Sequence, residues 1–260
     1  MLKILKYSFY DLMRSKWSYF YFLFYLLLGF LLLFLNNDVS KGIITLLNII
    51  VVLVPLIGTI FGIMYFYNAR EFTTLLLAQP IKRSHIFFGQ FLGVGGSLTL
   101  CLVLGLGIPF IVYGLMKSAA IWDFGLLLVV GACLTLIFTA LAFNVALRNT
   151  NRIKGFGYAV LLWLFLAIVY DGLFLLSLLI FEEYPLDTYA LIGSMANPID
   201  LSRILILLKL DISVLLGYTG AVFKSFFGTN KGLIVALFIL SLWIVIPVRW
   251  MIWEGDKKDF

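Results

Sequence analysis

Charge is scarce in this sequence. Only 12% of its 260 residues are Asp, Glu, Lys or Arg, while 63% are hydrophobic. A soluble domain carries about 25% charged residues, so this chain cannot cover its surface with water-compatible side chains. Apolar runs near or above about 18 residues recur, and the alternation typical of membrane strands is absent. The composition therefore predicts an all-α protein that crosses the membrane several times.

Groups that bind metals or catalyse reactions are also few. Both cysteines, Cys101 and Cys133, lie in apolar runs, and the single histidine, His85, has no nearby Cys or carboxylate partners. The six methionines do not gather on one helical face, so no metal site is expected. No phosphate-binding GxxxxGK[ST] loop occurs, and neither does a Ser-His-Asp or HExxH motif. The chain should therefore hold no cofactor and no catalytic residue, and any ATP must be hydrolysed by a partner.

Six apolar segments are long enough to span a bilayer, which takes about 20 residues in a helix. We predict spans over Trp17–Leu35, Ile43–Tyr67, Ile86–Met116, Phe124–Leu147, Phe156–Phe181 and Gly232–Trp253. Residues 1–16 precede them and repeat apolar residues at helical spacing. We expect this stretch to be an interfacial helix on the inner leaflet, with its apolar face formed by Leu2, Leu5, Phe9 and Leu12.

The basic residues favour one side of this layout. Segments 1–16, 68–85, 148–155 and 249–260 would share a side, and the two short loops opposite hold only Lys41 and Lys117. Basic loops face the cytoplasm, so both termini should be cytoplasmic. The net charge of +6 fits an anionic inner leaflet better than nucleic acid, because the basic residues are dispersed.

A short polar stretch between the second and third predicted spans, residues 68–90, has the pattern of a small device. Asn68 and Glu71 have the spacing of a reciprocal helix cap, and the turn after Pro80 is basic, with Ser84 able to cap the next helix. One face of the intervening helix is mostly apolar, at Phe72, Leu75, Leu76 and Gln79. We predict an amphipathic surface helix here; the plain alternative is an ordinary loop helix.

This stretch resembles the coupling helix of ABC-2 type ABC transporter permeases, which docks on the partner ATPase. The matching residues are Arg70, Glu71, Thr74, Leu75, Leu77, Pro80, Ile81, Arg83, Ile86 and Gly89. Thr73 and Gln90 depart from the commonest form, which has Gly and Lys there. The resemblance implies a cytoplasmic ATPase that binds ATP and Mg, a second copy of this chain, and a location in the bacterial inner membrane. The implied ATPase-coupling residues are Asn68, Arg70, Glu71, Thr74, Leu75, Gln79, Pro80, Arg83 and His85.

Three features inside the predicted spans leave alternatives open. Gly58 and Gly62, and likewise Gly89 and Gly93, place small residues four apart, which suits close helix packing within the chain or between two copies. Asp171 is the single acidic residue within a predicted span. It is either functional, as intramembrane carboxylates often are, or simply hydrated near the outer surface. We expect no second intramembrane charge to pair with it.

Residues 182–231 are expected outside the cytoplasm, as a segment too apolar for disorder. Ile199–Leu210 reads as a helix that begins after Asn197-Pro198 and lies on the outer leaflet or against a partner, and residues 218–228 read as a second short helix. The segment resembles permeases of the transporter that matures nitrous oxide reductase, whose copper centres it helps assemble. That resemblance implies a periplasmic beta-helical partner. The partner-binding residues would be Asn197, Pro198, Asp200, Arg203, Tyr218 and Phe223.

Two other functions stay open at this stage. A generic ABC-2 exporter of a lipid, peptide or drug would share the same architecture. A secondary transporter or channel would need inverted repeats or a line of intramembrane polar residues, and the sequence shows neither. The whole chain, residues 1–260, is expected to be one transmembrane domain.

Overall fold

The computed structural model describes residues 1–36, 39–115, 118, 120–181, 187–209, 223, 226 and 230–257. Six helical stretches within them are long and apolar enough to cross a membrane, as predicted. These are α2 (Lys16–Asn36), α3 (Val39–Asn68), α5 (Arg83–Val112), α6 (Ile121–Arg148), the run formed by α7 (Arg152–Leu164), η2 (Phe165–Val169) and α8 (Tyr170–Ile180), and α12 (Asn230–Lys257). No strand occurs in this part of the chain. The all-α prediction with six spans is confirmed.

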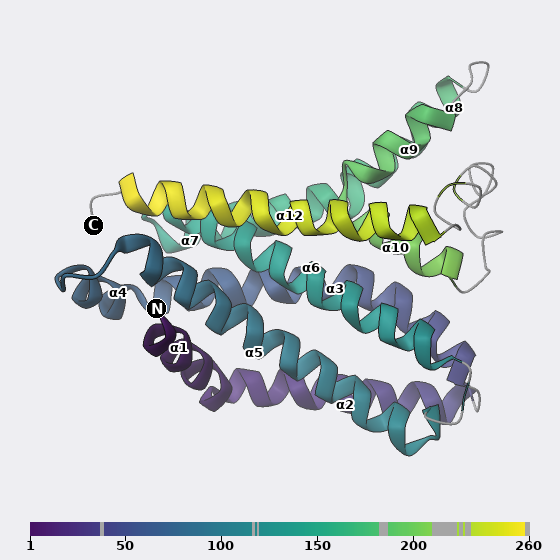
Figure 1. Ribbon diagram of the computed structural model, residues 1–260, viewed down its shortest axis with the longest axis horizontal. Helices are drawn as coiled ribbons and strands as arrows, with labels where there is room; N and C mark the ends of the chain where they lie inside the picture. Colours follow the sequence, from purple (N-terminus) through teal and green to yellow (C-terminus); the bar gives the residue numbers. More distant parts are fainter. Residues whose placement is uncertain are drawn as a thin grey trace.

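The spans differ in how much of their surface the chain itself covers. In α5 and α6, 61% of the most apolar window is buried, against 11% in the run from α7 to α8. The central helices α3, α5 and α6 therefore form the core, and the fifth span lies at the periphery, where lipid or another chain must cover it (Figure 1).

Glycines set the closest helix contacts, and these contacts lie within the chain. A Cβ on Gly62 would lie 3.0 Å from the Cβ of Ala142, where α3 meets α6. A Cβ on Gly93 would lie 2.6 Å from the Cβ of Ser8, where α5 meets α1 (Leu2–Arg14). Both glycine pairs therefore serve packing inside one subunit.

The N-terminal helix α1 forms as predicted, but it turns a different face inward. Ile4, Ser8 and Leu12 are buried, while Leu2 is 77% exposed. Ser8 occupies the contact with Gly93 because a larger side chain would not fit there. The predicted apolar face was therefore wrong at Leu2. The close contact between the backbones of α1 and α5, rather than hydrophobicity alone, decides which residues of α1 are buried.

The connection between the fifth and sixth spans folds back into the bundle. It contains α9 (Asp187–Met195), which the sequence did not predict, and α10 (Pro198–Lys209), bent by 115° at the break between them. The predicted helix after Asn197-Pro198 is thus confirmed, but its predicted surface position is wrong. Ile199, Leu201 and Leu205 are all buried, because a helix that is apolar nearly all round is stabilised inside a protein.

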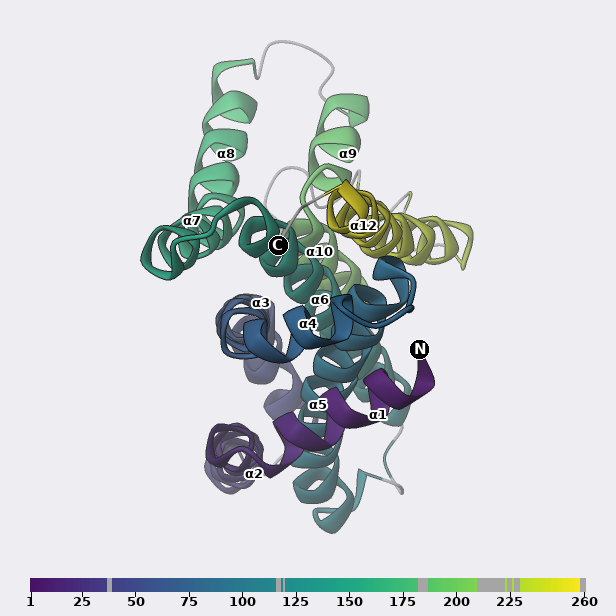
Figure 2. The same ribbon diagram turned by 90° about the vertical axis from the view of Figure 1, so that its left-hand side faces the viewer.

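Both termini lie at one end of the bundle, together with the short helix α4 (Arg70–Leu77), as Figure 1 shows. Figure 2 looks at this end: α1 crosses α5, and α4 lies between α3 and α5. An even number of spans requires the two termini to share a side. The predicted second helix at residues 218–228 lies outside the described residues, apart from Phe223 and Phe226, which are helical.

Candidate functional site: the α4 corner

The corner between α3 and α5 is built around α4, and it begins differently from the prediction. Asn68 is the last residue of α3, and the N-cap of α4 is Ala69, which has no side-chain cap. The Ala69 amide still donates a helical hydrogen bond to the Tyr65 carbonyl at 2.8 Å. The predicted reciprocal cap is therefore wrong, because α3 runs on through Asn68 and an N-cap needs a non-helical residue.

The end of α4 and the start of α5 also differ in detail. The last helical residue is Leu77, three positions before Pro80, and the Ile81 amide closes a tight turn on the Gln79 carbonyl at 2.7 Å. Helix α5 then starts at Arg83, after Lys82, and has no side-chain cap, so the predicted Ser84 cap is wrong. Proline still stops α4 from continuing into α5, as expected.

The two faces of α4 are unequal in burial. Thr73 is 3% exposed, and Phe72 and Leu76 are half-buried against the bundle. On the opposite side Glu71, Thr74 and Leu75 are exposed, Leu75 by 68%. The predicted apolar face is thus divided, since Leu75 and Gln79 face away from the bundle. What remains outside is a small surface with one large apolar side chain and one carboxylate.

A buried relay of hydrogen bonds holds α4 against α5. The Gln90 side-chain amide donates to the Thr73 hydroxyl at 2.8 Å, and that hydroxyl donates to the Ala69 carbonyl at 2.8 Å. Gln90 is 1% exposed and Thr73 3%, so the bond between these two side chains is shielded from water. Thr73 and Gln90 are the two positions that depart from the commonest family form, and they bind each other.

Contacts on the other sides of α4 connect it to two further parts of the chain. The Phe72 ring stacks on Tyr7 of α1, with centroids 4.3 Å apart. The Arg70 guanidinium donates to the Thr150 carbonyl in the connection between α6 and α7, at 3.4 Å. Beside it, the Tyr67 hydroxyl donates to the Asn149 carbonyl at 2.8 Å. Movement of α4 would therefore be felt by α1, α3, α5 and the α6–α7 connection.

The last turns of α12 join the same end of the molecule. Arg148 forms an ion pair with Glu254 at 2.6 Å, and its guanidinium lies over the Trp250 ring. Arg83 donates to the Asp256 carbonyl at 3.4 Å. Two of the predicted coupling residues, Arg70 and Arg83, thus contact distant parts of the chain, namely the α6–α7 connection and α12. His85 is exposed.

Sequence reasoning missed Tyr7, Tyr67 and Arg148 at this corner. They come from other helices, and aromatic and basic residues are common at membrane boundaries, so their types carried no distinguishing signal. Thr73 and Gln90 did carry one, as the two departures from the family pattern.

Two known proteins are similar to this chain over most of its length. A probable ABC transporter permease protein NosY of Stutzerimonas stutzeri is 27% identical over 219 residues, which cover 82% of this chain and 72% of the relative. A protein of the same description from Pseudomonas aeruginosa is 28% identical over 183 residues, covering 67% of this chain and 66% of the relative. No family model matches the chain. These similarities support the prediction of an ABC transporter permease that residues 68–90 suggested.

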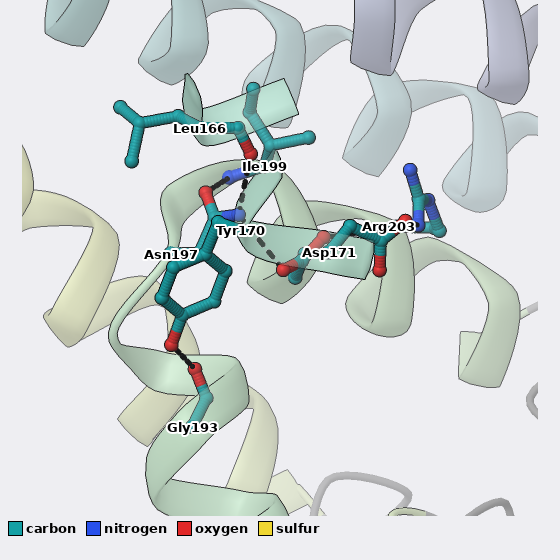
Figure 3. Close-up of polar contacts among 8 residues, drawn as sticks. Leu166, Tyr170, Asp171, Gly193, Asn197, Ile199 and Arg203 are labelled. Carbon is teal, nitrogen blue, oxygen red and sulfur yellow. Dashed lines mark hydrogen bonds and ion pairs between the residues drawn. The ribbon is translucent and has the colours of Figure 1, made fainter. Parts of the chain in front are cut away.

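The residues predicted to bind an outer partner lie apart from the α4 corner, and most of those described are at the start of α10 (Figure 3). Asn197 and Asp200 are buried, as is Phe223, and Arg203 is half-buried. Tyr218 lies outside the described residues. Asn197 caps α10 by accepting from the Ile199 amide at 3.1 Å, as its position before Pro198 suggested. Their role toward a partner stays a prediction.

Arg203 organises a cluster that corrects the expectation for Asp171. Its guanidinium binds the Asp171 carboxylate at 2.8 Å and lies 3.8 Å from the carboxylate of Asp200. The expected absence of a partner was wrong, because Arg203 comes from a helix that was placed outside the bundle. We call Asp171, Asn197, Asp200 and Arg203 the Arg203 cluster.

The Arg203 cluster also braces the irregular part of the fifth span. The Asn197 side chain donates to the Leu166 carbonyl at 2.7 Å and to the Asp200 carboxylate at 2.8 Å. Leu166 lies in η2, whose widened turn interrupts regular helical bonding. The cluster thus connects α8, η2 and α10.

Proposed function

We propose that this permease couples ATP hydrolysis by a cytoplasmic partner ATPase to movement of its membrane helices, and that α4 is the element the ATPase contacts. The observation that carries the proposal is the exposed face of α4, with Glu71, Thr74 and Leu75 facing away from a helix that is otherwise tied into the bundle. Leu75 is the apolar centre that a docking surface needs, and Glu71 and Arg83 supply charge at its edge.

The distribution of basic residues supports a cytoplasmic position for the end of the bundle that holds α4. Basic residues concentrate at the end that holds α4 and both termini, which the positive-inside rule assigns to the cytoplasm. The ATPase, its ATP and its Mg would then lie on the same side as α4. Transmission requires that the two shapes of the permease bind the nucleotide-loaded ATPase with different affinity.

The similarity to NosY proteins supports a finer proposal. The assembled transporter would contain two copies of this chain, two ATPases like NosF and a periplasmic beta-helical protein like NosD, and would serve assembly of the copper centres of nitrous oxide reductase. The sparse burial of the fifth span is compatible with a second copy beside it. Among the described residues, no group of three or more His, Cys, Asp or Glu side chains is placed to hold a metal ion, so the proposal assigns no copper site to them.

Co-purification with an ATPase like NosF tests the docking role. Leu75→Glu should reduce retention of the ATPase at least tenfold, because it places a charge at the centre of the contact. Glu71→Lys, as a separate variant, should reduce retention by more than Leu75→Glu does. Ile153→Glu is the matched control: Ile153 is 84% exposed at the same end, in the first turn of α7, where an acidic residue is tolerated. Full retention by both α4 variants, with folding intact, would rule out docking on α4.

A further inference from the structure

A cavity of about 700 Å³ lies at the base of α4. It is enclosed by α1, the start of α2, the end of α3 and the first turn of α4. Small-molecule sites have volumes of about 300–1,000 Å³, so the space is large enough for part of a lipid. Its lining includes Asp11, Arg14, Trp17, Ile60, Phe61 and Met64.

The cavity has an apolar wall and a polar wall. Ile60, Phe61 and Met64 come from one side of α3, within the apolar span. Asp11 and Arg14 of α1 bring charge to the same cavity. This division suits a molecule with an apolar tail and a polar head.

Charge around the mouth favours an anionic head. A second hollow on the exposed side of α1 adjoins the cavity and is lined by Lys3, Lys6, Asp11 and Arg14, so three cations face one carboxylate. Within the described chain, Arg14 has no ion-pair or hydrogen-bond partner. Basic residues beside an inner membrane surface attract anionic lipids.

We propose that the cavity binds one anionic phospholipid, with its phosphate at Arg14 and an acyl chain along Ile60, Phe61 and Met64. Trp17 at the mouth is 63% exposed, as expected for an aromatic residue at the headgroup level. The bound lipid would touch Asn68, Ala69 and the Tyr7–Phe72 stack, and so would stiffen the attachment of α4 to α1. Lipid binding itself is independent of the ATPase; an effect of the lipid on coupling rests on the proposed function.

Native mass spectrometry of the full chain, released from nanodiscs, tests the site. Nanodiscs of phosphatidylglycerol should leave one lipid bound, and phosphatidylcholine with the same acyl chains should compete poorly. Arg14→Gln should weaken retention of phosphatidylglycerol about fivefold, the effect of one basic residue near an anionic surface. Ile60→Trp, which fills the apolar wall, should abolish it.

Lys154→Gln is the control, since Lys154 is exposed at the same end of the bundle and lies outside the cavity. Equal retention of the two lipids, or retention unchanged by Arg14→Gln, would overturn the proposal. So would inorganic phosphate bound in place of lipid. If Ile60→Trp fails to fold, the lipid preference and Arg14→Gln still decide. Lipid binding with no ATPase association would leave this site intact and refute only the proposed coupling.

Discussion

The α4 corner and the Arg203 cluster are both polar, yet they use polarity differently. At the corner, two neutral hydrogen bonds, one bond from the Arg70 guanidinium and one ring stack fasten a short helix whose outer face stays open. In the cluster, three ionisable side chains and Asn197 bind one another between α8, η2 and α10, and Arg203 and Asp171 remain partly exposed. The corner therefore keeps an exposed surface, which is the proposed docking site, whereas the cluster connects an irregular span to α10.

Removal of Arg203 should have the largest effect. Arg203→Ala leaves Asp171 and the buried Asp200 without their cation, and breaking a partly buried pair of this kind costs about 3 kcal/mol. Arg203→Lys keeps the charge but replaces the planar guanidinium with an ammonium group, at a cost of about 1 kcal/mol. Denaturant unfolding in detergent would measure both free energies.

Charge removal on the acid side sharpens this prediction. Adding Asp171→Asn to Arg203→Ala should recover part of the lost stability, because one unpaired carboxylate disappears. A loss below about 0.5 kcal/mol for Arg203→Ala would mean that the cluster does not brace the fifth span.

The buried relay at the corner should give an intermediate effect. Thr73→Val leaves the Gln90 amide unpaired and should destabilise the permease by about 1.5 kcal/mol, as should Gln90→Leu. The double variant should lose less than the sum, because the two side chains serve one interaction. The same unfolding measurement applies.

Thr45→Val is the control for this pair. Its hydroxyl donates to the Lys41 carbonyl of the same helix in an exposed position, so the loss should stay within about 0.5 kcal/mol. Additive losses in the double variant would show that Thr73 and Gln90 act separately.

The ion pair between α6 and α12 should give the smallest effect. Arg148 is 49% exposed, so Arg148→Gln should cost only about 0.5 kcal/mol, and the loss should shrink further in high salt. Glu254→Gln should match it. A loss above about 1.5 kcal/mol from either variant would mean that this exposed pair, rather than the buried relay, fastens the end of the bundle.

Sequence patterns located the elements better than their contacts. The apolar runs fixed the six spans to within a few residues, because length and hydrophobicity alone decide whether a helix can cross a bilayer. The same runs could not show which side of α1 faces α5, since Ser8 is buried there for its size. We also predicted a surface position for α10, although a helix that is apolar nearly all round is expected to be buried.

The candidate sites show the same difference between local pattern and distant contact. Residues 68–90 carried a recognisable motif because a short amphipathic helix between two spans depends on local sequence. The Arg203 cluster carried none, since Asp171 and Arg203 are 32 positions apart and meet only through the fold.

By itself the sequence determined that this chain lies in a membrane, how many times it can cross, and where the water-facing helix between two crossings begins and ends to within a few residues. Those properties depend on transfer of side chains between water and lipid, which composition fixes locally. The tertiary structure alone decided which face of α4 stays open, that Thr73 binds Gln90, and that Asp171 has a cation. Each of these depends on the approach of helices distant in sequence, where a difference of one methyl group changes which residues meet.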